Sequence, residues 1–203
     1  MTSITKFWNW FIKKNKAYTF LNDVDEDDKE RLMDELLEQL HQYSENLYFE
    51  IGGMPGEDVE LIITATGNLE YFDEVETLVN NAPKIPGWRF ISFKPATPDN
   101  FTSNWEGLNL NTEDIWFGTL TNKKQPGFGI RVYLKNYDSI KDDERLEPLV
   151  YTILETIVGE KSFAVDLEYI DTDLQPNNPE KKALYPIIDL PEHIRLYKEG
   201  SLQ

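Results

Sequence analysis

The chain has 203 residues, 40% hydrophobic and 13% aromatic, which excludes a disordered chain because disordered segments are poor in aromatic residues. Its 37 acidic and 20 basic residues give a net charge of −17. This charge disfavours nucleic-acid or anionic-membrane binding, which draws on Lys and Arg. The lack of cysteine excludes disulfides, zinc–thiolate sites and cysteine nucleophiles. Because we find neither a membrane-spanning apolar run nor a signal peptide, we expect a cytoplasmic protein.

Two amphipathic helices are predicted in residues 1–44. Over residues 4–15, the apolar side chains fall on one face when successive residues are placed 100° apart. The second helix follows the acidic run 23–28 and extends to about Tyr43, with leucines at helical spacing. Acidic residues at its start suit the positive end of the helix dipole.

Strands and a third helix are predicted next. Residues 47–51 and 59–66 read as strands joined by a turn at 52–56 that is rich in glycine and proline. The second of these strands is almost continuously apolar, as expected for a central strand. A helix at 68–82 and a strand at 88–93 complete this part.

The rest of the chain is predicted to contain several short strands and two more helices. The expected strands are 101–105, 108–110, 115–120, 128–134, 163–174 and 184–188, and the helices are 142–158 and a short one from Pro191. Because strands and helices do not alternate strictly, we predict an α+β fold. It has a mixed, largely antiparallel sheet, helices packed mostly on one face, and two N-terminal helices. We expect a single domain, 1–203, with its core at 45–175 and a C-terminal extension at 176–203.

No metal motif is complete. The run 23–27, with aspartate at alternate positions, matches the first three ligands of a calcium loop. That loop requires glycine at its sixth position and glutamate at its twelfth, where this chain has Asp28 and Asp34. We interpret the run as an acidic helix start in water.

Catalytic and phosphate-binding motifs are also incomplete. His41 and His193 lack the spacing of a zinc site, and no serine lies in a G-x-S-x-G motif. We expect both histidines at the surface, or His41 as a cation at the C-terminal end of the second helix. The glycine-rich segments 52–56 and 127–129 lack either a P-loop lysine or a following helix, so we interpret them as turns. We therefore predict no catalytic residue, no metal and no cofactor.

Carboxylates gather on the predicted strand 163–174. Alternation places Asp166 and Glu168 together on one face, with Asp171 and Asp173 following. Paired carboxylates can serve acid–base chemistry, but a solvated sheet face carries such residues anyway.

Two small sets of residues are candidates for binding. Trp8, Trp10 and Phe11 lie beside four lysines in the first helix and can dock on a protein groove or a membrane surface, or else cap the domain's own core. Arg131 and Tyr133 alternate onto one strand face and can anchor an anionic ligand, or else form a structural ion pair.

Four segments, 60–67, 82–88, 129–133 and 153–160, resemble a recurring pattern in a family of uncharacterised bacterial proteins. The resemblance covers residues 47–170, and its motifs are strand and turn patterns rather than chemistry. It implies a bacterial origin and carries over no catalytic residues.

The function that we predict first is a non-enzymatic, acidic protein-interaction domain that binds a basic protein by charge complementarity. Its size and charge are similar to those of immunity or inhibitor proteins of bacterial competition systems. The aromatic helix or the acidic sheet face would make the contact. The alternative is a small-molecule-binding domain or a hydrolase whose site is assembled from scattered acidic, Arg and Tyr residues.

Overall fold

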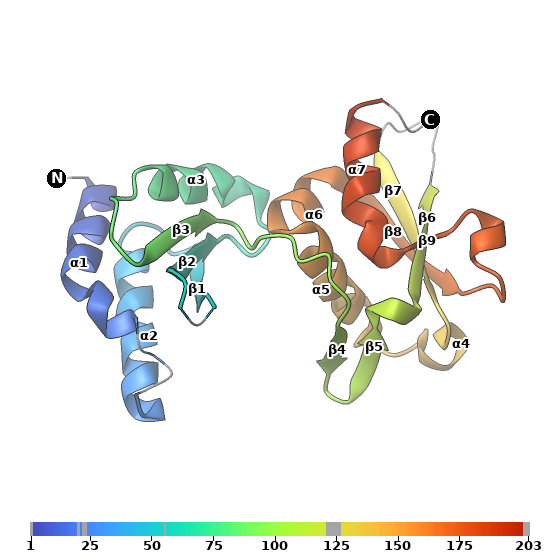
Figure 1. The fold of residues 1–203 in the computed structure, drawn as a ribbon, viewed down its shortest axis with the longest axis horizontal. Coiled ribbons are helices and arrows are strands. Elements are labelled where there is room, and N and C mark those ends of the chain that lie inside the picture. The colour runs from blue at the N-terminus through green and yellow to red at the C-terminus, as the bar shows by residue number, and fades with distance from the viewer. Residues whose placement is uncertain (1, 20, 22–23, 55, 121–126, 201–203) are drawn as a thin grey trace. The chain divides into compact units, whose positions relative to one another are not determined.

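The chain is an α+β protein, as predicted, and it folds as two compact units, Met1–Lys94 and Pro95–Gln203 (Figure 1). The computed structural model describes residues 2–19, 21, 24–54, 56–120 and 127–200. The single domain expected at 1–203 stays a prediction, which separate expression of the two units would test. No helix in the described part of the chain is both long and apolar enough to cross a membrane.

Unit 1 contains three helices and a three-stranded sheet within its described residues. In chain order they are α1 (Ser3–Tyr18), α2 (Glu26–His41), β1 (Tyr48–Gly52), β2 (Val59–Thr64), α3 (Phe72–Asn80) and β3 (Trp88–Ser92). β1 and β2 form an antiparallel hairpin, and α3 crosses over so that β3 lies parallel to β2. Residues 69–71, expected as the start of the third helix, form a separate 3-10 turn before α3.

Unit 2 consists of a hairpin, a four-stranded sheet and four helices among its described residues. The hairpin is β4 (Thr102–Trp105) with β5 (Leu108–Asn111). The sheet strands are β6 (Ile115–Leu120), β7 (Phe128–Leu134), β8 (Leu167–Leu174) and β9 (Tyr185–Pro186), in the order β8-β7-β6-β9. The helices are α4 (Tyr137–Ile140), α5 (Leu146–Val158), α6 (Glu160–Asp166) and α7 (Leu190–Lys198). The expected turn residues 121–126 lie outside the described residues, as do Asp23 and Pro55.

The two sheets share one topology. In each unit an antiparallel hairpin is followed by a helical crossover and then by a strand parallel to the second strand of the hairpin. The crossover is α3 in unit 1 and α4–α6 in unit 2. Unit 2 adds β9 and α7 after this core, so residues 176–203 supply part of its sheet and packing rather than an extension.

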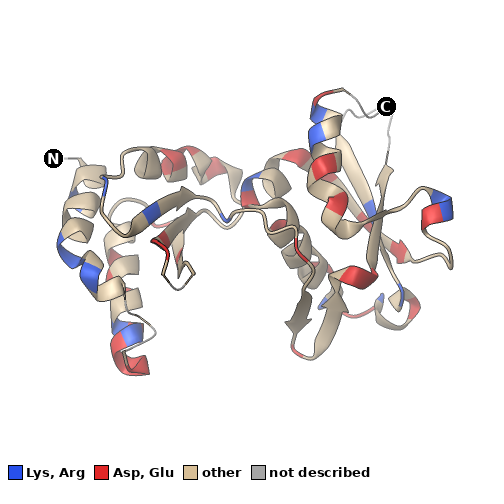
Figure 2. Cartoon of the chain, in the orientation of Figure 1, with Lys and Arg blue, Asp and Glu red and all other residues tan. Residues whose placement is uncertain are grey.

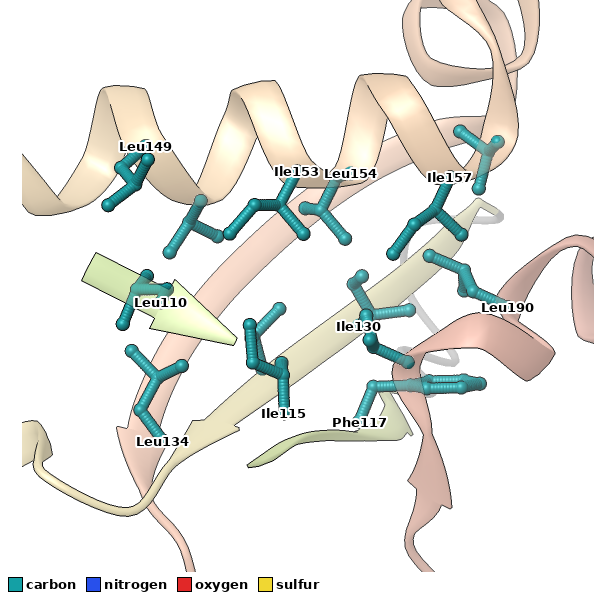
Figure 3. Close-up of a cluster of buried hydrophobic side chains, with 14 of the residues drawn as sticks. Leu110, Ile115, Phe117, Ile130, Leu134, Leu149, Ile153, Leu154, Ile157 and Leu190 are labelled. Atoms are coloured by element: carbon teal, nitrogen blue, oxygen red, sulfur yellow. The ribbon is translucent and has the colours of Figure 1, made fainter. Parts of the chain in front are cut away.

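The core of unit 2 lies between one face of its sheet and α5 with α7. Figure 3 shows Ile153, Leu154 and Ile157 of α5 above Ile115 and Ile130 of the sheet, with Leu190 at one end. β7 alternates buried aliphatic residues on this face with partly exposed residues on the other, the pattern of a strand covered on one side. The partly exposed residues of β7 therefore lie on the opposite face of the sheet, away from α5.

The prediction of a strand at 163–174 is wrong for its first four residues, which belong to helix α6. Gly159, at φ 81° and ψ 152°, ends α5, and the chain re-enters a helix that extends to Asp166 before β8 begins at Leu167. The alternation of Val165 with Leu167 across this junction mimicked a strand. α5 begins at Leu146, with Pro148 in its first turn, where a missing N–H costs nothing.

Candidate functional site

The face of the unit 2 sheet opposite α5, here called the outer sheet face, carries nine residues in three rows. The rows are Leu120 with Gly129 and Tyr169, Gly118 with Arg131 and Asp171, and Trp116 with Tyr133 and Asp173. Residues paired in register on neighbouring strands share a face, so each row crosses β6, β7 and β8 in turn. Both residues of the predicted ligand-binding pair, Arg131 and Tyr133, thus lie at the centre of this face.

Arg131 forms an ion pair with two carboxylates of β8. Its Nε and Nη2 atoms lie 2.9 Å and 2.7 Å from Oδ2 of Asp171, and Nη1 lies 3.5 Å from Oδ2 of Asp173. Hydrogen bonding to Asp171 raises the pKa of Arg131 above its ordinary value. Two carboxylates against one guanidinium leave a local charge of −1, which repels an anion. This is the structural ion pair named as the alternative reading.

Two glycines allow large side chains to lie flat on the outer sheet face. A Cβ atom on Gly118 would lie 2.8 Å from Cδ2 of Leu184 and 3.5 Å from Cε2 of Tyr133. A Cβ atom on Gly129 would lie 3.1 Å from Cβ of Tyr169. The side chains of Leu184, Tyr133 and Tyr169 therefore occupy the space that a side chain on these strands would need.

The aromatic residues of this face remain accessible. Tyr169 is 41% exposed, while Trp116 and Tyr133 are partly buried. Tyr, Trp and Arg are the residue types most often found at the energetic centres of protein interfaces. The face thus combines accessible aromatic rings with a carboxylate-rich border on β8.

The free edge of β8 is capped by the same aspartates. Because Gln175 donates its N–H to the carbonyl of Leu134, alternation directs the amides of Thr172 and Leu174 away from β7. These two amides donate to Oδ1 of Asp171 at 2.9 Å and Oδ1 of Asp173 at 2.7 Å. Capped amides disfavour the addition of a partner strand at this edge.

Two of the three predicted contact residues of the N-terminal aromatic helix, Trp8 and Phe11, are core residues of unit 1. Trp8 is 3% exposed, Phe11 is fully buried, and Trp8 Nε1 donates to the carbonyl of Leu78 at 2.9 Å. The Phe11 ring lies edge-on to Trp88 of β3, at 4.9 Å between centroids. The apolar stripe thus follows the alternative reading, as a cap on the unit's own core.

Trp10 lies at the margin of the same core. It is partly buried, and its ring centroid lies 6.1 Å from that of Tyr18. A lysine of α1 is also engaged within the unit, since Lys14 Nζ lies 2.8 Å from Oε1 of Glu35 on α2. The aromatic–lysine pattern is therefore largely explained by packing between α1 and its neighbours.

Neither histidine is an exposed surface residue. Nε2 of His41, which is partly buried, lies 3.2 Å from the carbonyl oxygen of Leu47. His193 is only 8% exposed and lies between the rings of Tyr185 and Phe117. The surface expectation failed for His193 because α7 packs into the core of unit 2.

Asp166 and Glu168, expected together on one strand face, lie on different elements. Asp166 ends α6, where it accepts from Ser162 Oγ at 2.7 Å and Lys198 Nζ at 2.9 Å. Glu168 lies on β8, and its carboxylate occupies the space that a side chain at Gly127 would need. Among the described residues, no group of three or more His, Asp or Glu side chains is placed to hold a metal ion. In the acidic run at the start of α2, Oδ1 of Asp25 caps the helix by accepting a hydrogen bond from the N–H of Asp28 at 2.9 Å.

Two surface hollows are also acidic. One, of about 400 Å³, lies where the start of α5 meets β8 and includes Glu147, Tyr151 and Ile170. The other, of about 620 Å³, lies along α2 and includes Glu30 and Asp34. Neither includes Arg131 or Tyr133, but the first is also lined by Asp171, the ion-pair partner of Arg131.

Comparison of the chain with family models, with curated proteins and with solved structures finds no match. This result agrees with the resemblance over residues 47–170 to proteins without an assigned function, and it adds no site residues. The outer sheet face therefore stands as the candidate site on its geometry alone.

Proposed function

We propose that the chain is a non-enzymatic, acidic interaction module of the bacterial cytoplasm, of the immunity or inhibitor type, which binds a basic protein through its outer sheet face. The observation that supports this most directly is the outer sheet face itself, where Trp116, Tyr133 and the exposed Tyr169 share a face with Arg131. Aromatic and arginine side chains in the centre of a patch are typical of residues that dominate binding energy.

The negative charge of the outer sheet face and of the whole chain favours a basic partner. Asp171 and Asp173 outnumber Arg131 on the face, and Glu168 lies exposed on the same strand. Figure 2 marks acidic residues in red along elements of both units, including α3, which has no Lys or Arg. A net charge of −17 attracts basic partners at long range and accelerates their association at low ionic strength.

The test is capture of partners from a native lysate on the purified protein, at low and at high salt. We expect a defined basic protein at low salt and its release at high salt, because screening weakens the attraction between opposite charges. An empty capture at both salt concentrations would contradict the proposal.

Alanine substitutions of two tyrosines with similar exposure test where the partner binds. Tyr169, 41% exposed, lies on the outer sheet face, whereas Tyr48, 44% exposed, lies on β1 of unit 1. Tyr169→Ala is expected to weaken binding of the captured partner at least tenfold, and Tyr48→Ala to leave it unchanged. Titration calorimetry measures both, after circular dichroism has shown that each variant is folded. Equal effects of the two substitutions would place the contact elsewhere.

The alternative, a small-molecule-binding or hydrolase site, is supported only by the hollow of about 400 Å³ beside Tyr151 and Ile170. A ligand there would raise the melting temperature of the chain in proportion to its binding free energy. Thermal-shift screening with cationic and neutral metabolites separates this alternative from protein binding. A saturable shift abolished by Tyr151→Phe or Glu147→Gln would favour it.

A further inference from the structure

His193 is a buried, unpartnered polar group in the last helix. Its side chain is 8% exposed, and its Nδ1 atom has no hydrogen-bond partner in the described part of the chain. The imidazole lies 4.1 Å from the ring of Tyr185 on β9 and 5.1 Å from the ring of Phe117 on β6, between centroids. Burial of a polar group without a partner costs free energy, and burial of its charged form costs more.

The groups around His193 have opposite effects on the protonation of its imidazole. Asp189 and Glu192, on its own segment, favour the protonated form, and β9 supplies the Tyr185 phenol. β6 presents the uncharged Phe117, and α5, which also packs on α7, adds only aliphatic side chains to the shared core. Desolvation outweighs the two carboxylates, so the pKa of His193 lies below its ordinary value of 6.5.

The element beside His193 is held by few backbone pairs. β9 consists of Tyr185 and Pro186, which pair with Phe117 and Trp116 of β6. Leu184, directly before β9, reaches the outer sheet face, because its Cδ2 atom occupies the space over Gly118. The short strand thus connects the buried imidazole to the face proposed to bind a partner.

We propose that residues 184–198, comprising β9 and α7, form a pH-sensitive strap that protonation of His193 releases from β6. Release exposes Phe117 and removes Leu184 from above Gly118, which alters the outer sheet face. The effect on partner binding rests on the function proposed above, whereas the release itself does not.

The direction of the pH effect follows from linkage. The released segment binds a proton at the ordinary histidine pKa of about 6.5, whereas the docked segment binds it only at lower pH. Docking is therefore fully stable above pH 6.5 and weakens as the pH falls from there through the lowered pKa. Between those two values, the equilibrium constant for release rises by up to about tenfold per pH unit.

Hydrogen exchange between pH 7.5 and pH 5, corrected for the intrinsic exchange rate, tests the strap without any partner. We expect residues 184–198 to lose protection at least threefold over this range while β1–β3 keep theirs. His193→Phe, which suits the aromatic surroundings, should abolish the pH dependence, and His41→Gln should preserve it. Unchanged protection in the wild type, or the same loss in His193→Phe, overturns the proposal.

A direct titration keeps the proposal testable if His193→Phe does not fold. In His41→Gln the remaining imidazole belongs to His193, so its NMR signals report that group alone. A pKa below 6.5 with simultaneous loss of protection in the strap supports the proposal, and a pKa at or above 6.5 overturns it. Because neither measurement uses a partner, a failed capture experiment leaves this result unaffected.

Discussion

Arg131 illustrates how neighbours change what a residue can do. On a bare strand its guanidinium would attract anions, but Asp171 and Asp173 occupy its donors and reverse the local charge. All three side chains are exposed enough that the ion pair itself adds at most about 1 kcal/mol to stability. The trio therefore matters more for the charge that the outer sheet face presents than for the stability of the fold.

Substitutions at the neighbouring residues Phe11 and Ile12 test whether the aromatic stripe of α1 belongs to the core or to a contact surface. Phe11 is fully buried against Trp88, whereas Ile12 is 47% exposed. Phe11→Ala is expected to lower the free energy of unfolding of unit 1 by about 3–5 kcal/mol, because it leaves a cavity among aromatic rings. Ile12→Ala should change it by less than about 0.5 kcal/mol.

Denaturant unfolding of the whole chain measures both substitutions. A loss of stability confined to Phe11→Ala confirms that the aromatic stripe belongs to the core. If Phe11→Ala instead left stability unchanged and abolished partner capture, α1 would be the contact element and the outer sheet face would not.

Strand β8 combines two tasks that conflict in most edge strands. It carries a third of the outer sheet face, and it also ends the sheet, where free amides invite pairing with another chain. Asp171 and Asp173 resolve the conflict because each carboxylate binds Arg131 on the face and an outward amide at the edge.

Removal of both edge caps is expected to cause self-association. The double variant Asp171→Thr with Asp173→Thr keeps residues suited to a strand but frees the amides of Thr172 and Leu174. Sedimentation velocity should show dimers or larger species that increase with protein concentration, relative to the wild type. Asp142→Thr with Glu144→Thr removes the same charge from an exposed loop and should not associate further. Equal association of both double variants would attribute the effect to charge alone.

The sequence predicted most elements of this fold but not their grouping. Periodicity located α1, α2 and α5 and the strands β2, β6 and β7, because each has a single unambiguous pattern. It failed at residues 163–166, where seven residues of helix between Gly159 and β8 are too short to show a 3.6-residue period. The topology could not be read, because strand pairing depends on contacts distant in sequence, such as β7 with β8.

The candidate site was predicted in part. Alternation placed Arg131 and Tyr133 on one face, and the structure agrees, but nothing local indicated that Asp171 and Asp173 would lie opposite them. Trp116 and Tyr169 were missed as site residues, since their position on the open face depends on which side α5 covers. His193 was misplaced because a polar residue near the chain end normally lies in water.

Because the two units have separate cores, we expect each unit to fold as a domain of its own. The core of unit 1 is built from α1, α2 and α3 with its own three-stranded sheet, and that of unit 2 from α5 and α7 with the other sheet. The strand pairs of each sheet are complete within its unit, because no strand of one sheet pairs with the other in the described part of the chain. Neither unit therefore needs the other to satisfy its strand hydrogen bonds.

Fragments 1–94 and 95–203, expressed separately, are expected to fold. Each should give dispersed amide NMR signals and a single cooperative thermal transition, since each buries its own apolar core. A matched pair cut inside unit 2, 1–140 and 141–203, should leave β8, β9 and α5 without β6 and β7, so the shorter fragment should lack a cooperative transition. If 95–203 binds the captured basic protein as tightly as the whole chain does, the outer sheet face is sufficient for recognition. If only 1–94 binds, the acidic surface of unit 1 is the contact.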